Sequence, residues 1–256
     1  MIRTILPLAK RLLLGGLMIV ATHLAAAAET PIGSSIESRV TLAFTVESDA
    51  LAAWAPEGWV PVPFPRGPFS GANLITNLID QRAGYDAEGN VTDPPNRRAV
   101  AFLGLAKEAS GDAVRIFIYR NYVSDGSDTY GTERQATVTR TLTQSGNANL
   151  GRDHQDAWSI STDDGAFSVS LSFTTGKPVW SPNEARPFSA ANPAFSRIYR
   201  YDQLTDLLMS TALGKPLSGS FEMSTDIPEL AAVFDGSESL VAIADVPVYV
   251  RKISLP

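Results

Sequence analysis

The sequence has no cysteine among its 256 residues. Thiolate catalysis, thiolate metal sites and disulfide bonds are therefore excluded, and so is a lipid anchor on an N-terminal cysteine. Such a chain is held together by burial of its apolar side chains. Its length is sufficient for one domain with a single sizeable core.

Histidine is almost as scarce, because His154 is the one histidine beyond residue 28. A serine triad would need His154 as its base and Asp153 or Asp156 to orient it, but no G-x-S-x-G motif supplies the serine. Nucleotide-binding motifs of the G-x-G-x-x-G and Walker types are also missing. We therefore expect no cofactor.

One polar loop has some features of a metal site. The loop Arg82–Arg98 contains four oxygen-bearing side chains in a pattern similar to a calcium loop, namely Asp86, Glu88, Asn90 and Asp93. Its glycine, Gly89, stands at the fourth position instead of the sixth, and the twelfth position is Arg97 instead of a bidentate glutamate. We interpret the loop as a solvated turn and expect no metal.

The N-terminal segment has the three parts of a secretory signal peptide. Basic residues within Met1–Arg11 precede the apolar run Leu12–Val20, and the small residues Ala25–Ala28 contain an A-x-A cleavage pattern. The apolar run is short for a bilayer span of about 20 residues. We therefore expect that residues 1–28 are removed, that the protein is periplasmic or secreted, and that no stable membrane anchor remains.

The chain that follows residue 28 is acidic. Residues 1–28 contain three of the 21 basic residues and none of the 27 acidic ones, which leaves 18 basic against 27 acidic residues and a net charge of −9. Its lysines are few and scattered, at Lys107, Lys177, Lys215 and Lys252. Nucleic acids and anionic membranes select clustered Lys and Arg, so neither is an expected partner.

Alternation of apolar and polar residues predicts a mainly β fold with a few short helices. The first strand, Ile36–Val46, leads into a short helix that Pro56 ends, then a stiff crossing with four prolines. Further strands are predicted at Asn73–Ile79, Ala99–Leu105, Val114–Tyr122, Gln135–Thr143, Asp156–Ser161, Ala166–Thr174, Ser218–Met223 and Leu240–Ile253. This density of strands favours antiparallel pairing, so we expect a single antiparallel β-barrel or cone domain over residues 29–256.

Two segments in the second half depart from the strand pattern. Tyr201–Leu213 has leucines at helical spacing and is followed by Gly214 and Pro216, which predicts a helix that covers one end of the barrel. The stretch Lys177–Phe195 is predicted to be irregular.

Two stretches resemble the acetoacetate decarboxylase-like proteins. Within Val40–Gln81 a strand, a short helix ending in Ala-Pro-Glu-Gly-Trp and a Gly-Ala-Asn-Leu-Ile strand are similar to the start of that family. Ile118–Asp125 followed by Tyr-Gly-Thr-Glu at 130–133 looks like the strand and the glycine-x-glutamate turn before the family's catalytic lysine. The resemblance implies a cone-shaped β fold around an apolar cavity, which is a common type of binding site for small organic molecules.

The same comparison reveals a departure from the family. Its decarboxylases carry paired lysines after this turn, one of which forms a Schiff base while its neighbour lowers the pKa of the first. Counting onward from Gly131 places Thr139 and Arg140 at these positions. Neither side chain can form an imine, so we expect no Schiff-base decarboxylation.

Three residues of the family-like turn and strand are candidates for ligand binding: Arg120, Tyr130 and Glu133. Each also has a structural interpretation, because only half of the residues in a strand point inward. Arg120 could pair with a surface carboxylate, Tyr130 could pack at an edge and Glu133 could be a solvated turn residue.

The sequence leaves two functions open. The first is an exported protein that binds a small organic molecule in the cavity without Schiff-base chemistry. The second is an enzyme of the same fold, a lyase or hydrolase, that uses Glu133 or His154 as acid or base. An enzyme should bring a carboxyl or imidazole group with a perturbed pKa to the cavity, whereas a binding protein can have an apolar one.

Overall fold

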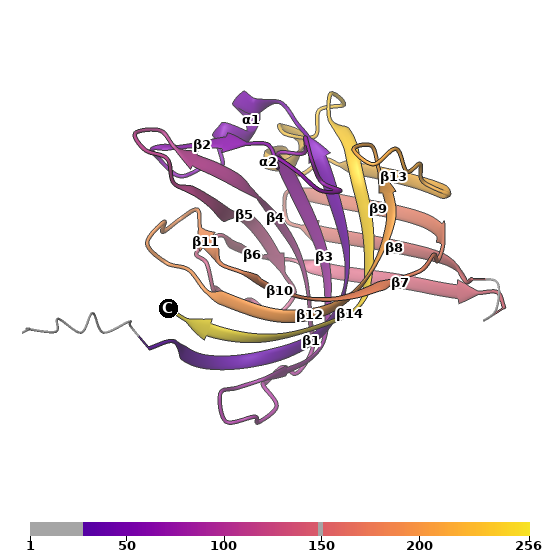
Figure 1. Cartoon of the computed structure of the whole chain (residues 1–256), viewed down its shortest axis with the longest axis horizontal. Coiled ribbons are helices and arrows are strands. Elements are labelled where there is room, and N and C mark those ends of the chain that lie inside the picture. The colour runs from indigo at the N-terminus through magenta and orange to yellow at the C-terminus, as the bar shows by residue number, and fades with distance from the viewer. Residues whose placement is uncertain (1–27, 148–150) are drawn as a thin grey trace, which may run out of the picture.

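The computed structural model of the chain describes residues 28–147 and 151–256 (Figure 1). The signal peptide predicted for residues 1–28 lies outside the described residues, except for Ala28. Within the described part, no helix is long and apolar enough to cross a membrane. The mainly β prediction is confirmed, since helices are limited to the short α1 (Ser48–Ala52) and α2 (Pro228–Ala231) in these residues.

Most strands belong to one large, strongly curved sheet (Figure 1). The order across this sheet is β10 (Val179–Ala185), β12 (Ile198–Ser210), β14 (Ser239–Leu255), β1 (Thr30–Thr45), β3 (Leu74–Tyr85), β4 (Arg97–Glu108), β5 (Val114–Val123) and β11 (Pro187–Ser189). Two short strands join from the side, β2 (Trp59–Val62) on β4 and β6 (Glu133–Gln135) on β5. Neighbours are antiparallel except that β6 and β11 run parallel to β5.

A smaller antiparallel sheet packs against one face of the large sheet. Its order is β13 (Gly219–Thr225), β9 (Gly165–Thr174), β8 (Asp153–Thr162) and β7 (Thr137–Ser145). The strands β8 and β9 form a hairpin with its turn at Thr162–Gly165, and in both strands buried residues alternate with exposed or half-buried ones. The described strands thus form two open sheets instead of one barrel closed by hydrogen bonds.

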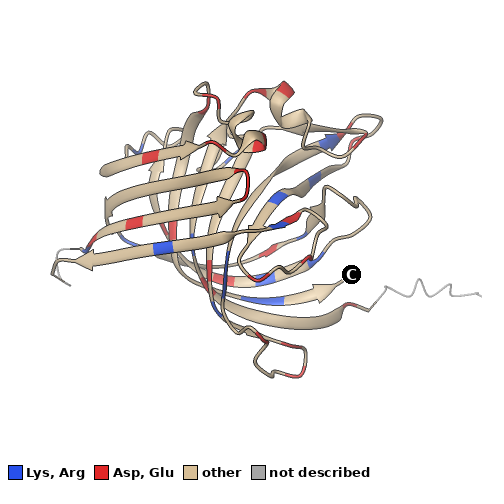
Figure 2. Ribbon diagram, turned by 180° about the vertical axis from the view of Figure 1, so that it is seen from behind, with Lys and Arg blue, Asp and Glu red and all other residues tan. Residues whose placement is uncertain are grey.

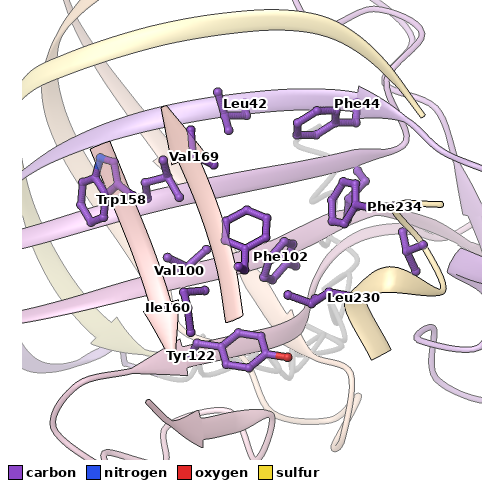
Figure 3. Packing of buried hydrophobic residues seen from close by; sticks show 14 of the residues in the cluster. Leu42, Phe44, Val100, Phe102, Tyr122, Trp158, Ile160, Val169, Leu230 and Phe234 are labelled. Carbon is purple, nitrogen blue, oxygen red and sulfur yellow. The ribbon is translucent and has the colours of Figure 1, made fainter. Parts of the chain in front are cut away.

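The main hydrophobic core fills the space between the two sheets (Figure 3). Phe102 of β4 lies near its centre, and its ring meets those of Trp54, Tyr122, Phe167 and Phe234 at centroid distances of 5.8 to 6.1 Å. These aromatic neighbours come from the loop after α1, from both sheets and from the segment after α2. The two short helices therefore close this core at one end.

Two predictions about the second half are wrong. Tyr201–Leu213 is not a helix, because Ile198–Ser210 forms the strand β12 between β10 and β14. Its register against β14 shifts twice, between Leu204 and Asp206 and between Leu207 and Met209. A bulge moves side chains to the other face, so a bulged strand with leucines on both faces can imitate helical spacing. The stretch expected to be irregular contains the edge strands β10 and β11, and edge strands tolerate its prolines.

Candidate functional site

The large sheet encloses a cavity of about 960 Å³ on the face opposite the core. Along β1 the side chains alternate, so that Glu37, Arg39 and Thr41 line the cavity while Val40 and Leu42 enter the core. Apolar side chains from β3, β4 and β5 form much of the wall, among them Ile75, Ile79, Leu103, Ile116 and Ile118. The smaller sheet contributes no lining residue among those described.

A buried ion cluster stands in the cavity wall where β1 meets β14. The Glu37 carboxylate accepts hydrogen bonds from Arg39 Nε at 2.7 Å and from Ser35 Oγ at 2.6 Å, and it lies 2.9 Å from Arg251 Nη2. Burial alone would raise the pKa of Glu37, but the charges of Arg251 and Arg39 hold this pKa down at about 2. Two arginines on one carboxylate leave a net positive charge in this part of the wall.

Aromatic rings surround the cluster. Arg39 lies over the ring of Tyr249 at 3.7 Å from its centroid, and Arg251 lies over the ring of Tyr199 at 4.4 Å. Tyr201 stacks on Tyr249 with 4.7 Å between centroids. Ring faces stabilise guanidinium groups by cation–π attraction, which fixes the positions of both arginines. Figure 2 shows basic residues on strands near the C-terminal end of the molecule, where β14 ends.

A third arginine in the wall lacks a partner on one of its nitrogens. Arg197, in the segment before β12, lines the cavity, and its Nε is buried without a hydrogen bond in the described structure. Its charge acts on the nearby Tyr130, whose hydroxyl group is hydrogen-bonded to that of Tyr199. Arg197 also forms no ion pair with a carboxylate among the described residues, so its charge is not neutralised by the protein there.

The structure brings two of the three predicted site residues to the cavity. Tyr130 and Glu133 both line it. The Tyr130 side chain is buried, and burial together with the neighbouring Tyr199 raises the pKa of Tyr130, so this hydroxyl group stays neutral. The carboxylate of Glu133 accepts hydrogen bonds from the backbone N–H groups of Tyr130 and Thr132 at 2.9 to 3.0 Å. Glu133 therefore shapes the turn around Gly131 as well as facing the cavity.

Arg120 lies on the opposite face of β5 and does not line the large cavity. The pairing of β4 with β5 shifts between Phe102 and Leu103, which leaves Tyr119 as an extra residue. This bulge turns Arg120 toward α2, where its Nε donates to Glu229 at 2.9 Å. Arg120 instead lines a separate small cavity of about 280 Å³. The expectation that it faces the large cavity with Tyr130 and Glu133 is wrong.

The other residues considered in the sequence also lie away from the large cavity. His154 of β8 is buried against Phe173, with 4.7 Å between ring centroids, and burial lowers the pKa of this imidazole. Arg140 of β7 is turned toward the core side, where its guanidinium binds Asp156 at 2.7 Å. Thr139, its neighbour, is exposed. Neither position of the family's lysine pair therefore contacts the cavity.

Two lysines do reach the cavity. Lys177 and Lys215 are among its lining residues, and both are exposed. The Lys215 ammonium group donates to the carbonyl oxygen of Leu207. Neither lysine lies beside a second cation of the kind that activates a Schiff-base lysine in sequence, since Gly176 and Pro178 flank the first and Gly214 and Pro216 the second.

Sequence reasoning missed the arginines of the wall. Glu37, Arg39 and Arg251 come from the two ends of the chain and meet only because β1 pairs with β14. The sequence of β1 contains one indication of the ion cluster. Charged residues that alternate with apolar ones in a strand must either be exposed to solvent or form ion pairs. Alternation in β1 could thus have marked Glu37 and Arg39, but nothing in the sequence identifies Arg251 as their partner.

The comparison with known proteins gives a consistent picture. No protein-family profile matches the sequence, and no curated protein does. Among solved structures, the enduracididine biosynthesis enzyme MppR complexed with pyruvate is similar over 92% of this chain and 92% of its own, with 11% identity and a TM-score of 0.52. An acetoacetate decarboxylase-like enzyme from Sphingomonas wittichii RW1 is similar over 89% of this chain and 92% of its own, with 10% identity and a TM-score of 0.51. At such low identity the likeness shows the fold alone.

Proposed function

We propose that this chain, which has the acetoacetate decarboxylase-like fold, is an exported protein that binds a small carboxylate-bearing organic molecule in its large cavity without forming a lysine imine. The observation that carries the proposal is Arg197, a cavity-lining arginine that forms no ion pair with a carboxylate of the described structure. A carboxylate is a planar acceptor that matches a guanidinium group.

The size and the lining of the cavity support a small organic ligand. Its volume of about 960 Å³ falls within the range of about 300 to 1,000 Å³ that is typical of such sites. Isoleucine and leucine side chains would contact the apolar part of the molecule. The neutral hydroxyl group of Tyr130 and the amide of Asn121, whose Oδ1 is buried without a partner, add polar groups on the same wall.

The charge of the wall supports an anion. Glu37 is already paired with both Arg39 and Arg251, so it leaves the wall positive rather than negative. Arg197 adds a further positive charge close to Tyr130. Among the fold neighbours, MppR is described in complex with pyruvate, which is a small carboxylate, and this agrees with the proposed ligand class.

The absence of imine chemistry is supported by the positions of the candidate amines. Thr139 and Arg140, which counting onward from Gly131 places at the lysine positions of the family, cannot form an imine and do not line the cavity. Lys177 and Lys215 reach the cavity but are exposed, and no neighbouring residue in the sequence supplies the second cation. Export is supported by the signal-peptide pattern of residues 1–28.

An enzyme of this fold is the second candidate, and the fold neighbours, which are enzymes, favour it. Glu133 is the better of the two acid–base candidates, because it lines the cavity whereas His154 is packed on the far side of the large sheet. Both oxygens of Glu133 already accept backbone hydrogen bonds, which would have to weaken for proton transfer.

Titration with pyruvate as the probe tests the proposal. We expect that calorimetry detects binding of pyruvate to the wild-type protein and that Arg197→Met weakens the affinity by roughly tenfold or more. This factor corresponds to the loss of a hydrogen bond to a charged group, which contributes about 1.5 to 3 kcal/mol. Arg66→Met is the matched control, because Arg66 is exposed and does not line the cavity. Equal affinity of the wild type and Arg197→Met would refute the assignment of Arg197, and consumption of pyruvate would favour the enzyme.

A further inference from the structure

A second cluster of charged groups lies where the small sheet packs near β12 and β14, next to the cavity wall. Asp206 of β12 stands directly opposite Asp245 of β14, and both side chains are at most 4% exposed. Like charges directly across a strand pair destabilise it, and burial strengthens the effect. Two ionised carboxylates are therefore unfavourable at this position.

The charged groups around this pair do not neutralise it. Each element that packs here contributes one or two groups: Arg140 from β7, His154 and Asp156 from β8, and Asp80 from β3. The one cation among them, Arg140, is engaged by both oxygens of Asp156 at 2.7 and 3.0 Å and also reaches Asp80 at 3.4 Å. His154 is buried and kept neutral by its lowered pKa.

The two carboxyl groups differ in their contacts. Asp206 accepts a hydrogen bond from the backbone N–H of Gly176. The carboxyl group of Asp245 has no hydrogen bond or ion pair with the described residues, and the charges of Arg140, Asp156 and Asp206 act on it. Burial first, and then the charges of Asp156 and Asp206, raise the pKa of Asp245 to about 7. Asp245 is therefore the carboxyl group of this pair that binds a proton most readily in the folded protein.

The pair sits in strands that also form the cavity wall. On β14 the neighbours of Asp245, Ala244 and Val246, line the cavity. On β12 Asp206 itself lines it, together with its neighbours Thr205 and Leu207. The pairing of β12 with β14 also shifts register next to Asp206. Any repulsion between the carboxylates thus acts on a bulged strand pair that is one wall of the cavity.

We propose that a proton on Asp245, directly opposite Asp206, keeps β12 paired with β14, and that loss of this proton loosens this wall of the cavity and weakens ligand binding. The loosening of the strands follows from the carboxyl pair alone. The effect on the ligand rests on the proposed function.

The direction of the pH dependence follows from linkage. The carboxyl group of Asp245 has a pKa of about 7 when β12 and β14 are paired, and an exposed aspartate has a pKa of about 4. Protonation therefore stabilises the paired strands at low pH, and this stabilisation is lost as the pH rises from about 4 to about 7. Between pH 5 and pH 8 the opening of β12 should increase by up to about a hundredfold, a tenfold change for each pH unit up to about 7. Above this range the opening should be constant.

Hydrogen exchange of the full chain tests the switch without a ligand. We expect that the amides of β12, corrected for the intrinsic pH dependence of exchange, lose protection between pH 5 and pH 8 in the wild type and not in Asp245→Asn. The control Asp202→Asn changes an exposed carboxylate on the same strand and should keep the wild-type response. A pH-independent wild type, or the same pH response in Asp245→Asn, would overturn the proposal.

Two further measurements separate the possible failures. If Asp245→Asn does not fold, Asp206→Asn removes the repulsion from the other strand and should show the same flat profile. Pyruvate titration at pH 5 and pH 8 then tests the link to the ligand. Binding that is weaker at pH 8 in the wild type, but equal at both pH values in Asp245→Asn, supports the link. If pyruvate binds at neither pH, the proposed function is contradicted. The hydrogen-exchange result then decides by itself whether a proton on Asp245 controls the pairing of β12 with β14.

Discussion

The buried Glu37 carboxylate should be one of the largest single electrostatic contributions to the stability of this protein. Its side chain is fully buried and contacts Ser35, Arg39 and Arg251. The fall of its pKa from the ordinary 4.5 to about 2 corresponds to a stabilisation of about 3 kcal/mol at neutral pH, at 1.36 kcal/mol for each pKa unit. The perturbation that removes this charge with little change in shape is Glu37→Gln.

The assay is urea unfolding followed by tryptophan fluorescence between pH 7 and pH 3. Because the folded pKa is depressed, the stabilisation is present above about pH 4.5 and is lost as the pH falls toward 2. The difference in free energy of unfolding between the wild type and Glu37→Gln should therefore be about 3 kcal/mol at pH 7 and about 1 kcal/mol at pH 3. The absolute stabilities will change with other groups, but their difference isolates Glu37.

The control for this measurement is Glu88→Gln, which changes an exposed glutamate of the loop before β4. Exposed substitutions usually change stability by less than about 0.5 kcal/mol. A Glu37→Gln variant that loses no more than this control at pH 7, or whose loss does not shrink toward pH 3, would refute the reasoning.

Two further predictions concern the frame that holds the cavity. Phe102→Ala removes a fully buried ring from the centre of the core and should lower the free energy of unfolding in urea by about 3 to 5 kcal/mol. A decrease below about 1 kcal/mol would contradict the central position of this ring. Gly219→Ala should cost more than about 1 kcal/mol, since its φ is +149° and a Cβ atom there would lie 1.8 Å from the carbonyl oxygen of Ser172. Gly58→Ala is the control for Gly219→Ala, because its φ is also positive but no atom lies within 4 Å of the added Cβ; equal losses in the two variants would show that the close contact is unimportant.

The strands that were predicted correctly include β8 and β9, with one face buried and the other largely exposed, and also β3 and β4, which are buried on both faces. β8 and β9 alternate over their whole length, so their period is visible in the sequence. β12 was predicted wrongly because two bulges interrupt its period and give its leucines a helical spacing. A bulge arises from pairing with a neighbouring strand, so the local pattern does not show it.

The candidate site was predictable only in part for the same reason. The turn at Tyr130 and Glu133 was found from its resemblance to a family, and both residues line the cavity. Arg120 was misplaced by a single extra residue in β5, since one bulge turns every later side chain to the other face. Arg197 and Arg251 could not be selected in advance, because their neighbours in the cavity are distant in the sequence.

The central claim is that the cavity binds a small carboxylate without covalent chemistry at a lysine. Native mass spectrometry of the protein purified from its own source, repeated after borohydride reduction in the presence of pyruvate, tests this claim most directly. The account predicts that a small molecule remains bound without covalent attachment and that no lysine gains mass on reduction. A reduced adduct on any lysine, with Lys177 and Lys215 the two that reach the cavity, would contradict the claim and restore imine chemistry.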